Sequence, residues 1–260
     1  MAMSTSNPSK RRLESLKLGA LDAQIRDPVY ALAERLAARL GDNLESITVV
    51  GSSLTPDFRA GHSDINTVVL IHEQTMECLS AAASLTRPMR RKKISPPLLM
   101  TSSYIARSRD VFGVELLDFQ LTHETVLGTD PFAALTFDKK NVRLQCEREL
   151  KAMLVRLRQG YIAAAANKRL VRDILISTAR GLAPFLRAML WLRDIDRPRE
   201  TEATFSKAAN QFCVNLDPLA TAGKWRHEKA RLGGTEMEYA FASVHAAVEQ
   251  LATIVDKLEV

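Results

Sequence analysis

Residues 49–71 read VVGSSLTPDFRAGHSDINTVVLI, and this stretch decides the fold. Its first residues end an apolar, β-branched run at residues 44–50, which predicts a buried strand. That strand leads into Gly51-Ser52-Ser53, a tight polar turn, and a loop then connects to a second β-branched run at residues 65–71. We therefore expect two neighbouring strands that bring the glycine-serine turn and the start of the second strand to one edge of a sheet.

Polar groups gather where these elements meet. Glycine lets a backbone come close to a ligand, and successive amides with a serine hydroxyl can hold phosphate oxygens. Gly51, Ser52 and Ser53 are therefore candidate nucleotide-binding residues. Asp64 and Asn66 are two residues apart, so on a strand their side chains share one face. We expect both to project together toward the turn.

A third candidate lies at residues 111–120 (VFGVELLDFQ), which we interpret as another strand. An acid within an apolar strand is costly to bury unless it is paired or binds a metal. Asp118 is therefore the third acidic candidate. Glu115, on the other face of such a strand, is the alternative third carboxylate, whereas Asp57 and His62 are interpreted as solvated loop residues.

The order Gly51-Ser52, then Asp64 about a dozen residues later, then Asp118 resembles the signature of nucleotidyltransferases of the DNA polymerase beta superfamily. Residues 114–132 (VELLDFQLTHETVLGTDPF) also look like the third-strand region of small stand-alone members. The resemblance covers about residues 27–132. The chain departs from the family pattern at Asn66, where a second carboxylate is usual.

The resemblance implies two-metal phosphoryl transfer, in which Asp64 and Asp118 hold Mg²⁺ or Mn²⁺. A nucleoside monophosphate would pass from a nucleoside triphosphate to a hydroxyl of a small molecule or protein. Asp64, Asp118 and Asn66 would be the catalytic residues, with Asn66 as an auxiliary contact. Asn66 offers a neutral oxygen and two N–H donors in place of a second carboxylate. Charges about 4 Å apart at an effective dielectric near 20 interact by roughly 4 kcal/mol, so the usual reaction would slow by roughly a thousandfold. Two functions stay open: a weakened nucleotidyltransferase, or a degenerate one that binds nucleotide or a protein partner.

We predict an α+β fold: a small mixed or antiparallel sheet with helices, followed by an all-α helical bundle. Residues 1–25 form a disordered or partly helical lead-in, 26–138 the nucleotidyltransferase-like domain and 139–260 the bundle. The first helix should begin at Asp27-Pro28 and stop at Gly41. From residue 141 the apolar period is helical, indicating four or five helices, with a kink or break at Pro184.

The composition excludes several classes of protein. Cys78, Cys146 and Cys213 are odd in number and form no CxxC, which argues against disulfides and cysteine zinc sites and favours the cytoplasm. No apolar run is long enough to span a bilayer. P-loop, HExxH and GxSxG motifs are missing from the sequence.

The net charge of +6 favours anionic partners, although many proteins with such an excess bind none. The densest basic run is at residues 87–93 (RPMRRKK). It is either a solvated connector or a contact for a triphosphate or a nucleic-acid backbone. No interleaved aromatic residues support base stacking, so nucleic acid is the less favoured partner. The sequence leaves the oligomeric state open, and a dimer is compatible with it.

Overall fold

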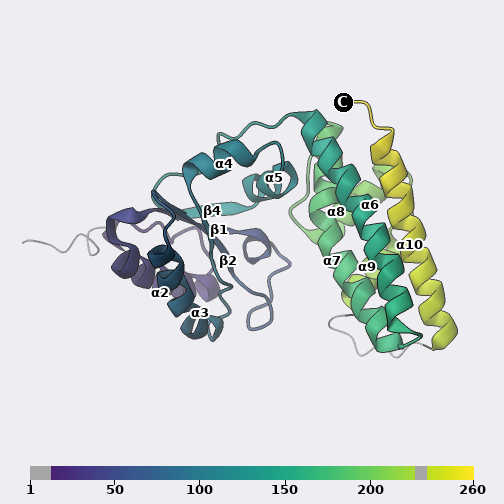
Figure 1. Cartoon of the computed structure of the whole chain (residues 1–260), viewed down its shortest axis with the longest axis horizontal. Helices are drawn as coiled ribbons and strands as arrows, with labels where there is room; N and C mark the ends of the chain where they lie inside the picture. The colour runs from purple at the N-terminus through teal and green to yellow at the C-terminus, as the bar shows by residue number, and fades with distance from the viewer. Residues whose placement is uncertain (1–12, 226–232) are drawn as a thin grey trace, which may run out of the picture. The chain divides into compact units, whose positions relative to one another are not determined.

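The computed structural model of the chain describes residues 13–225 and 233–260 (Figure 1). The first half of the expected N-terminal lead-in, residues 1–12, lies outside the described residues. The chain divides into two compact units. The sheet unit comprises Met1–Arg109 with Phe119–Thr136, and the helical unit comprises Asp110–Asp118 with Phe137–Val260.

Four strands form the sheet, in the order β3-β2-β1-β4. Their bounds are Leu44–Val50 for β1, Asn66–Ile71 for β2, Leu98–Met100 for β3 and His123–Leu127 for β4. β1 is antiparallel to β2 and β4, whereas β3 runs parallel to β2. The predicted mixed, mostly antiparallel sheet is therefore confirmed, as are both predicted strands that flank the glycine-serine turn.

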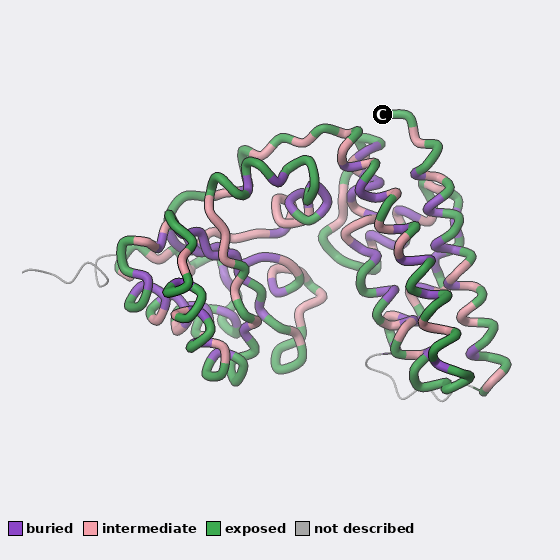
Figure 2. The backbone as a smooth tube through the Cα atoms, in the orientation of Figure 1, coloured by how far each residue is buried: buried purple, intermediate pink, exposed green. Residues whose placement is uncertain are grey.

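Two helices cover one face of this sheet. α2 (Ala23–Leu40) packs against α3 (Met76–Arg90) and against β1. Their buried side chains form one core with alternate residues of the strands, among them Ile47, Val49 and Val69. Figure 2 marks the buried stretches of the backbone in purple. Side chains at the intervening strand positions therefore point to the opposite face.

The opposite face of the sheet carries polar side chains. Partners across an antiparallel pair point to the same face, so Val50 shares its face with Asn66 of β2 and His123 of β4. Thr48, two residues before Val50, lies opposite Thr125, and their hydroxyl oxygens are 2.9 Å apart. The groups expected to bind a ligand thus lie on the face away from α2 and α3.

Within its described residues, the second unit is built of helices and their connections. Its long and short helices are α6 (Lys139–Ala164), α7 (Lys168–Leu192), α8 (Thr201–Phe212), α9 (Asp217–Lys224) and α10 (Gly234–Asp256). α7 packs against all the others, and their buried apolar side chains form one core. The predicted bundle is confirmed, with α9 as an additional short helix. Within residues 13–225 and 233–260, no helix combines the length and apolar character that a membrane crossing requires.

The predicted third strand at residues 111–120 is wrong. Residues Gly113–Leu121 form helix α5, and the strand follows it as β4. Val114 and Leu117 are both buried in the core of the helical unit, and their spacing of three residues is helical. On a strand these two side chains would point to opposite faces, so only a helix buries both against one partner.

The first helix begins earlier than predicted. Asp22 rather than Asp27 caps it, because the Asp22 side chain accepts a hydrogen bond from a backbone N–H of the first turn at 2.8 Å. Ile25 is fully buried, so packing favours the additional turn, and Pro28 lies inside the helix. The predicted stop at Gly41 is confirmed, with a φ of 52° that glycine adopts readily.

Two other prolines also lie inside helices. Of the predicted kink or break at Pro184, the break is wrong: α7 continues through this proline, with buried residues on both sides of it. α3 continues through Pro88 to Arg90. The first four residues of the basic run are therefore the end of a helix rather than part of a connector.

Candidate functional site

The glycine-serine turn follows β1 directly. Gly51 has a φ of 79°, in the left-handed region that favours glycine, and opens the short 3₁₀ helix Gly51–Leu54. Its backbone N–H donates to the Thr122 carbonyl at 3.0 Å. A Cβ placed on Gly51 would lie 4.0 Å from the Asn66 amide nitrogen. The turn and Asn66 are therefore neighbours, held by a glycine-dependent backbone.

Asp64 and Asn66 flank a residue that fixes their direction. Ile65 is buried in the core beneath α2 and α3, and it bridges to Ile94. Its N–H donates to the Lys93 carbonyl at 2.7 Å. Because neighbouring residues of an extended chain point to opposite faces, Asp64 and Asn66 point away from that core. Both are exposed, so a ligand at the turn can reach them.

The two serines of the turn differ. Ser52 is exposed, and its carbonyl accepts hydrogen bonds from the Thr55 backbone N–H at 3.2 Å and hydroxyl at 3.0 Å. Ser53 is buried, and within the described residues its hydroxyl has no hydrogen-bond partner. Of the predicted phosphate contacts, the hydroxyl of Ser52 is the one that faces solvent.

The loop between the turn and β2 closes on itself. The Arg59 N–H donates to the Ser63 hydroxyl at 3.1 Å, and the Ser63 N–H donates to the Arg59 carbonyl at 2.8 Å. Phe58 packs against the core under the sheet. His62 is exposed in this loop. The loop thus has its own anchor and presents Asp64 at its end.

Asp118 belongs to the helical unit and is paired there. Its two carboxylate oxygens accept from Arg187 of α7, at 2.5 Å from Nε and 3.1 Å from Nη2. Both side chains are largely buried, with 15% of Asp118 and 11% of Arg187 exposed. The expectation that an acid here must be paired or bind a metal is met by an arginine. The proposed metal role therefore has a competing partner that the sequence analysis did not identify.

The other acid of α5 is also engaged. The Gln145 side chain of α6 donates to the Glu115 carboxylate at 2.6 Å, and its oxygen accepts from the Val114 N–H at 2.9 Å. Gln145 is itself buried. Glu115, the alternative third carboxylate, thus helps to dock α5 on α6.

No other strand residue supplies the expected third carboxylate. β3, the neighbour of β2, consists of Leu98, Leu99 and Met100. On β4, Glu124 lies opposite Val49 and therefore on the helix-covered face. Among the residues that the structure describes, no three side chains of His, Cys, Asp or Glu gather so that they could hold a metal ion. The donors at this edge therefore do not fit a pair of magnesium ions.

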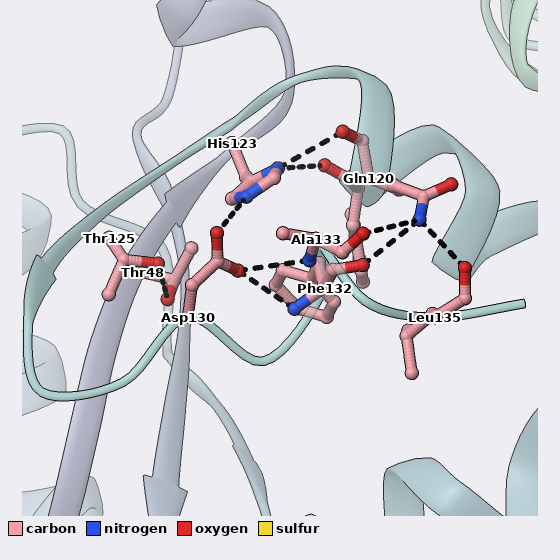
Figure 3. A network of polar contacts seen from close by, with 9 residues as sticks. Thr48, Gln120, His123, Thr125, Asp130, Phe132, Ala133 and Leu135 are labelled. Carbon is pink, nitrogen blue, oxygen red and sulfur yellow. Dashed lines mark hydrogen bonds and ion pairs between the residues drawn. The ribbon is translucent and has the colours of Figure 1, made fainter.

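A polar network that the sequence analysis missed supports the turn (Figure 3). His123 of β4 has its Nδ1 2.9 Å from the Phe119 carbonyl and 3.2 Å from the Gln120 carbonyl. Its Nε2 is 2.9 Å from an Asp130 carboxylate oxygen. Both ring nitrogens thus face oxygen atoms.

The same network holds the segment that follows β4. Asp130 accepts from the backbone N–H groups of Phe132 at 2.8 Å and Ala133 at 3.2 Å. Burial raises the pKa of the Asp130 carboxyl, but the hydrogen bonds from His123 and these amides outweigh it, so that the pKa is lowered overall. The Gln120 amide donates to the carbonyls of Phe132 and Ala133 and, at 2.9 Å, of Leu135. This segment is thereby fixed to β4, beside the carbonyl that anchors Gly51.

Comparisons with known proteins concern the fold. No protein-family model matches the chain, and no curated protein matches its sequence. Among solved structures, the chain is similar to spectinomycin adenyltransferase AAD(9) from Enterococcus faecialis, whose crystal structure contains ATP and spectinomycin. The TM-score is 0.57 at 10% identity, over 89% of this chain and 99% of that chain. The chain therefore shares the fold of a nucleotidyltransferase, in its helical part as well as in its sheet.

Proposed function

We propose that this protein is a nucleotidyltransferase-fold nucleotide binder whose site has lost the carboxylates for efficient transfer. One observation carries the proposal: Asp64 and Asn66 face solvent beside the Gly51 turn, and the neighbouring strand β3 has no acid. The exposed Ser52 hydroxyl and the backbone N–H groups that follow Gly51 in the turn suit phosphate oxygens. The similarity of the fold to an ATP-binding adenyltransferase supports a nucleoside triphosphate as the ligand.

In this proposal the divalent cation arrives with the nucleotide. Magnesium commonly keeps several waters and is bound through substrate phosphates and one or two carboxylates. Asp64 would supply the carboxylate, and Asn66 a neutral oxygen or an N–H donor to phosphate. Asp118 is left to its ion pair with Arg187.

Thermal unfolding with each of ATP, GTP, CTP and UTP, in Mg²⁺ or Mn²⁺, tests the proposal. A nucleotide present at about a hundred times its Kd should stabilise the fold by roughly 2.7 kcal/mol. Ser52→Val and Asp64→Asn should remove that stabilisation. His62→Gln, an exposed change in the same loop, should keep it. If no nucleotide and metal pair shifts the unfolding transition, the proposal fails.

The similarity to AAD(9) also favours a second candidate, transfer of a nucleotide to a hydroxyl of a small molecule. Pyrophosphate release from ATP, measured with and without spectinomycin, separates the two. The binding proposal expects no release above the Asp64→Asn background. Release that depends on Asp64 would establish the enzyme instead.

A further inference from the structure

A second surface lies on the sheet unit, at the outer edge of the sheet. A groove of about 520 Å³ runs between α3 and β3 and ends near α4 (Ser102–Ser108). Leu79, Ala83 and Thr86 line it from α3, and Tyr104 lines it from α4. Leu79 and Tyr104 are 38% and 42% exposed, so the groove presents a large apolar and an aromatic side chain to solvent.

The groove follows the open edge of the sheet. β3 is the terminal strand and pairs only with β2. Consecutive residues 96–100 all line the groove. Because successive strand residues point to opposite faces, a hollow that touches all of them runs along the backbone of the strand. An edge strand leaves hydrogen-bonding groups that another extended chain can pair with.

The positive charge of the protein is concentrated in this segment. Residues 78–109, which span most of α3 and the whole of β3 and α4, contain seven basic and no acidic side chains. The whole chain carries +6 and this segment +7, so all other residues together carry −1. From the start of α3 to the end of α4, residues 76–108 contain six basic side chains and one acidic side chain, Glu77, so the elements that build the groove and their connections carry +5 of the chain's +6.

Five of these cations lack counter-charges. Arg87, Arg90, Arg91, Lys92 and Lys93 are all exposed, and none forms an ion pair with another described residue. On a helix, residues four apart lie on the same side. Arg87 follows Ala83 and Arg90 follows Thr86 by four, so the cations continue the helical wall of the groove.

We propose that this groove binds an extended acidic peptide of a partner protein. The peptide backbone pairs with the free edge of β3, alternate apolar side chains enter the groove, and acidic side chains meet the cations at residues 87–93. Charge complementarity selects an acidic partner. The apolar lining and the open strand edge select a peptide over nucleic acid, since Tyr104 is the single aromatic residue of the lining.

Panning a library of random dodecapeptides against the full chain tests the proposal, because such a library contains acidic, basic and neutral sequences alike. The expected result is enrichment of acidic sequences with alternating apolar residues. Two variants serve as parallel targets: Ala83→Arg, which fills the groove from an exposed position, and a quadruple change of Arg87, Arg90, Arg91 and Lys92 to Gln. Thermal unfolding of both should match the parent, because every changed side chain is exposed.

Fluorescence polarisation of the enriched peptide then separates the contributions. Ala83→Arg should weaken binding by at least about tenfold at every salt concentration. The quadruple variant should weaken it by about tenfold at low salt and flatten its salt dependence. N-methylation of alternate peptide amides should weaken binding in one register only, as strand pairing requires.

Three outcomes overturn the proposal. The first is no enrichment above the Ala83→Arg target. The second is binding that ignores both variants. The third is displacement of the peptide by single-stranded DNA that itself binds the Ala83→Arg variant normally, which would make the surface a nucleic-acid site.

Discussion

Asp64 and Asp118 fit one sequence pattern, yet they occupy opposite physical situations. Asp64 is exposed at the end of a loop, and within the described residues it has no ion-pair partner. Asp118 is largely buried and accepts hydrogen bonds from two guanidinium nitrogens of Arg187, Nε and Nη2. An acid without a partner at a glycine turn is available for a ligand, whereas an acid held by a buried arginine serves the fold. We infer from this contrast that an ion pair with a buried partner marks an acid that stabilises the fold, whereas an exposed acid without one can bind a ligand.

The largest expected effect comes from breaking the buried pair. Arg187→Met should lower the free energy of unfolding by roughly 3 kcal/mol, because it leaves the largely buried Asp118 carboxylate without its ion-pair partner. Arg187→Met combined with Asp118→Leu should recover most of that loss. Urea denaturation followed by circular dichroism measures both.

The exposed acid supplies the matched control for that experiment. Asp64→Asn should change the free energy of unfolding by no more than about 0.5 kcal/mol, since the side chain is exposed. If Asp64→Asn were as destabilising as Arg187→Met, the division between a structural and a functional acid would be wrong.

Restoring a carboxylate at position 66 tests whether Asp64 and its neighbour on the strand bind one cation together. Asn66→Asp adds a charge next to Asp64, on the same face of the sheet, and should tighten binding of the magnesium complex of ATP by about tenfold. Isothermal titration with the Asp64→Asn/Asn66→Asp double variant as control measures the gain. Unchanged affinity would mean that the two side chains do not share a cation.

A smaller effect is expected from the backbone of the turn. Gly51→Ala should cost roughly 1 kcal/mol, because its φ of 79° is left-handed while the new Cβ meets only ordinary contacts. Gly61, with a φ of 75° and open space around its Cβ position, gives a matched control with the same strain. Only Gly51→Ala should also weaken nucleotide binding. Equal binding by both variants would separate the turn from the ligand.

The parts of the fold set by local patterns were predictable. The β-branched runs on either side of Gly51 gave two correct strands, and the helical period after residue 141 gave the bundle. The prediction of a strand at residues 111–120 is wrong because the acidic and apolar residues there follow neither the two-residue period of a strand nor the 3.6-residue period of a helix clearly. Val114 and Leu117 could be assigned to one face only once α6 and α7 were in place to pack against them.

The part of the site that depends on local patterns was also predictable. Asp64 and Asn66 follow from the alternation of a strand, which is local, and so does their place beside the turn. The partner of Asp118 is distant in the sequence, because Arg187 follows it by 69 residues. The partner of His123 is Asp130, which lies in a loop whose conformation no periodic pattern predicts. The His–Asp spacing within residues 122–132 was the one available signal for the network.

The smallest expected effect concerns pH and the Asp130 network. The pKa of the Asp130 carboxyl is lowered in the folded protein. Its interactions with His123 and the backbone amides therefore stabilise the fold to their full extent above the unfolded carboxyl pKa of about 4. That stability is lost as pH falls through the folded pKa. Because the Asp130 side chain is 37% exposed, solvent screening keeps the effect below about 1 kcal/mol. Comparing urea midpoints at pH 5 and pH 3, the parent should lose more stability than Asp130→Asn.

His123→Gln shows whether that loss comes from the network. The variant removes the ring that donates to Asp130, so a further Asp130→Asn change should alter the pH dependence less than it does in the parent. An undiminished difference would assign the pH dependence to the backbone amides of Phe132 and Ala133 alone. In that case His123 would not hold the segment behind the turn, and changing it should leave nucleotide binding unaltered. If instead His123→Gln weakens nucleotide binding, the network serves ligand binding, as Asp64 does, because it positions the turn beside which Asp64 is exposed.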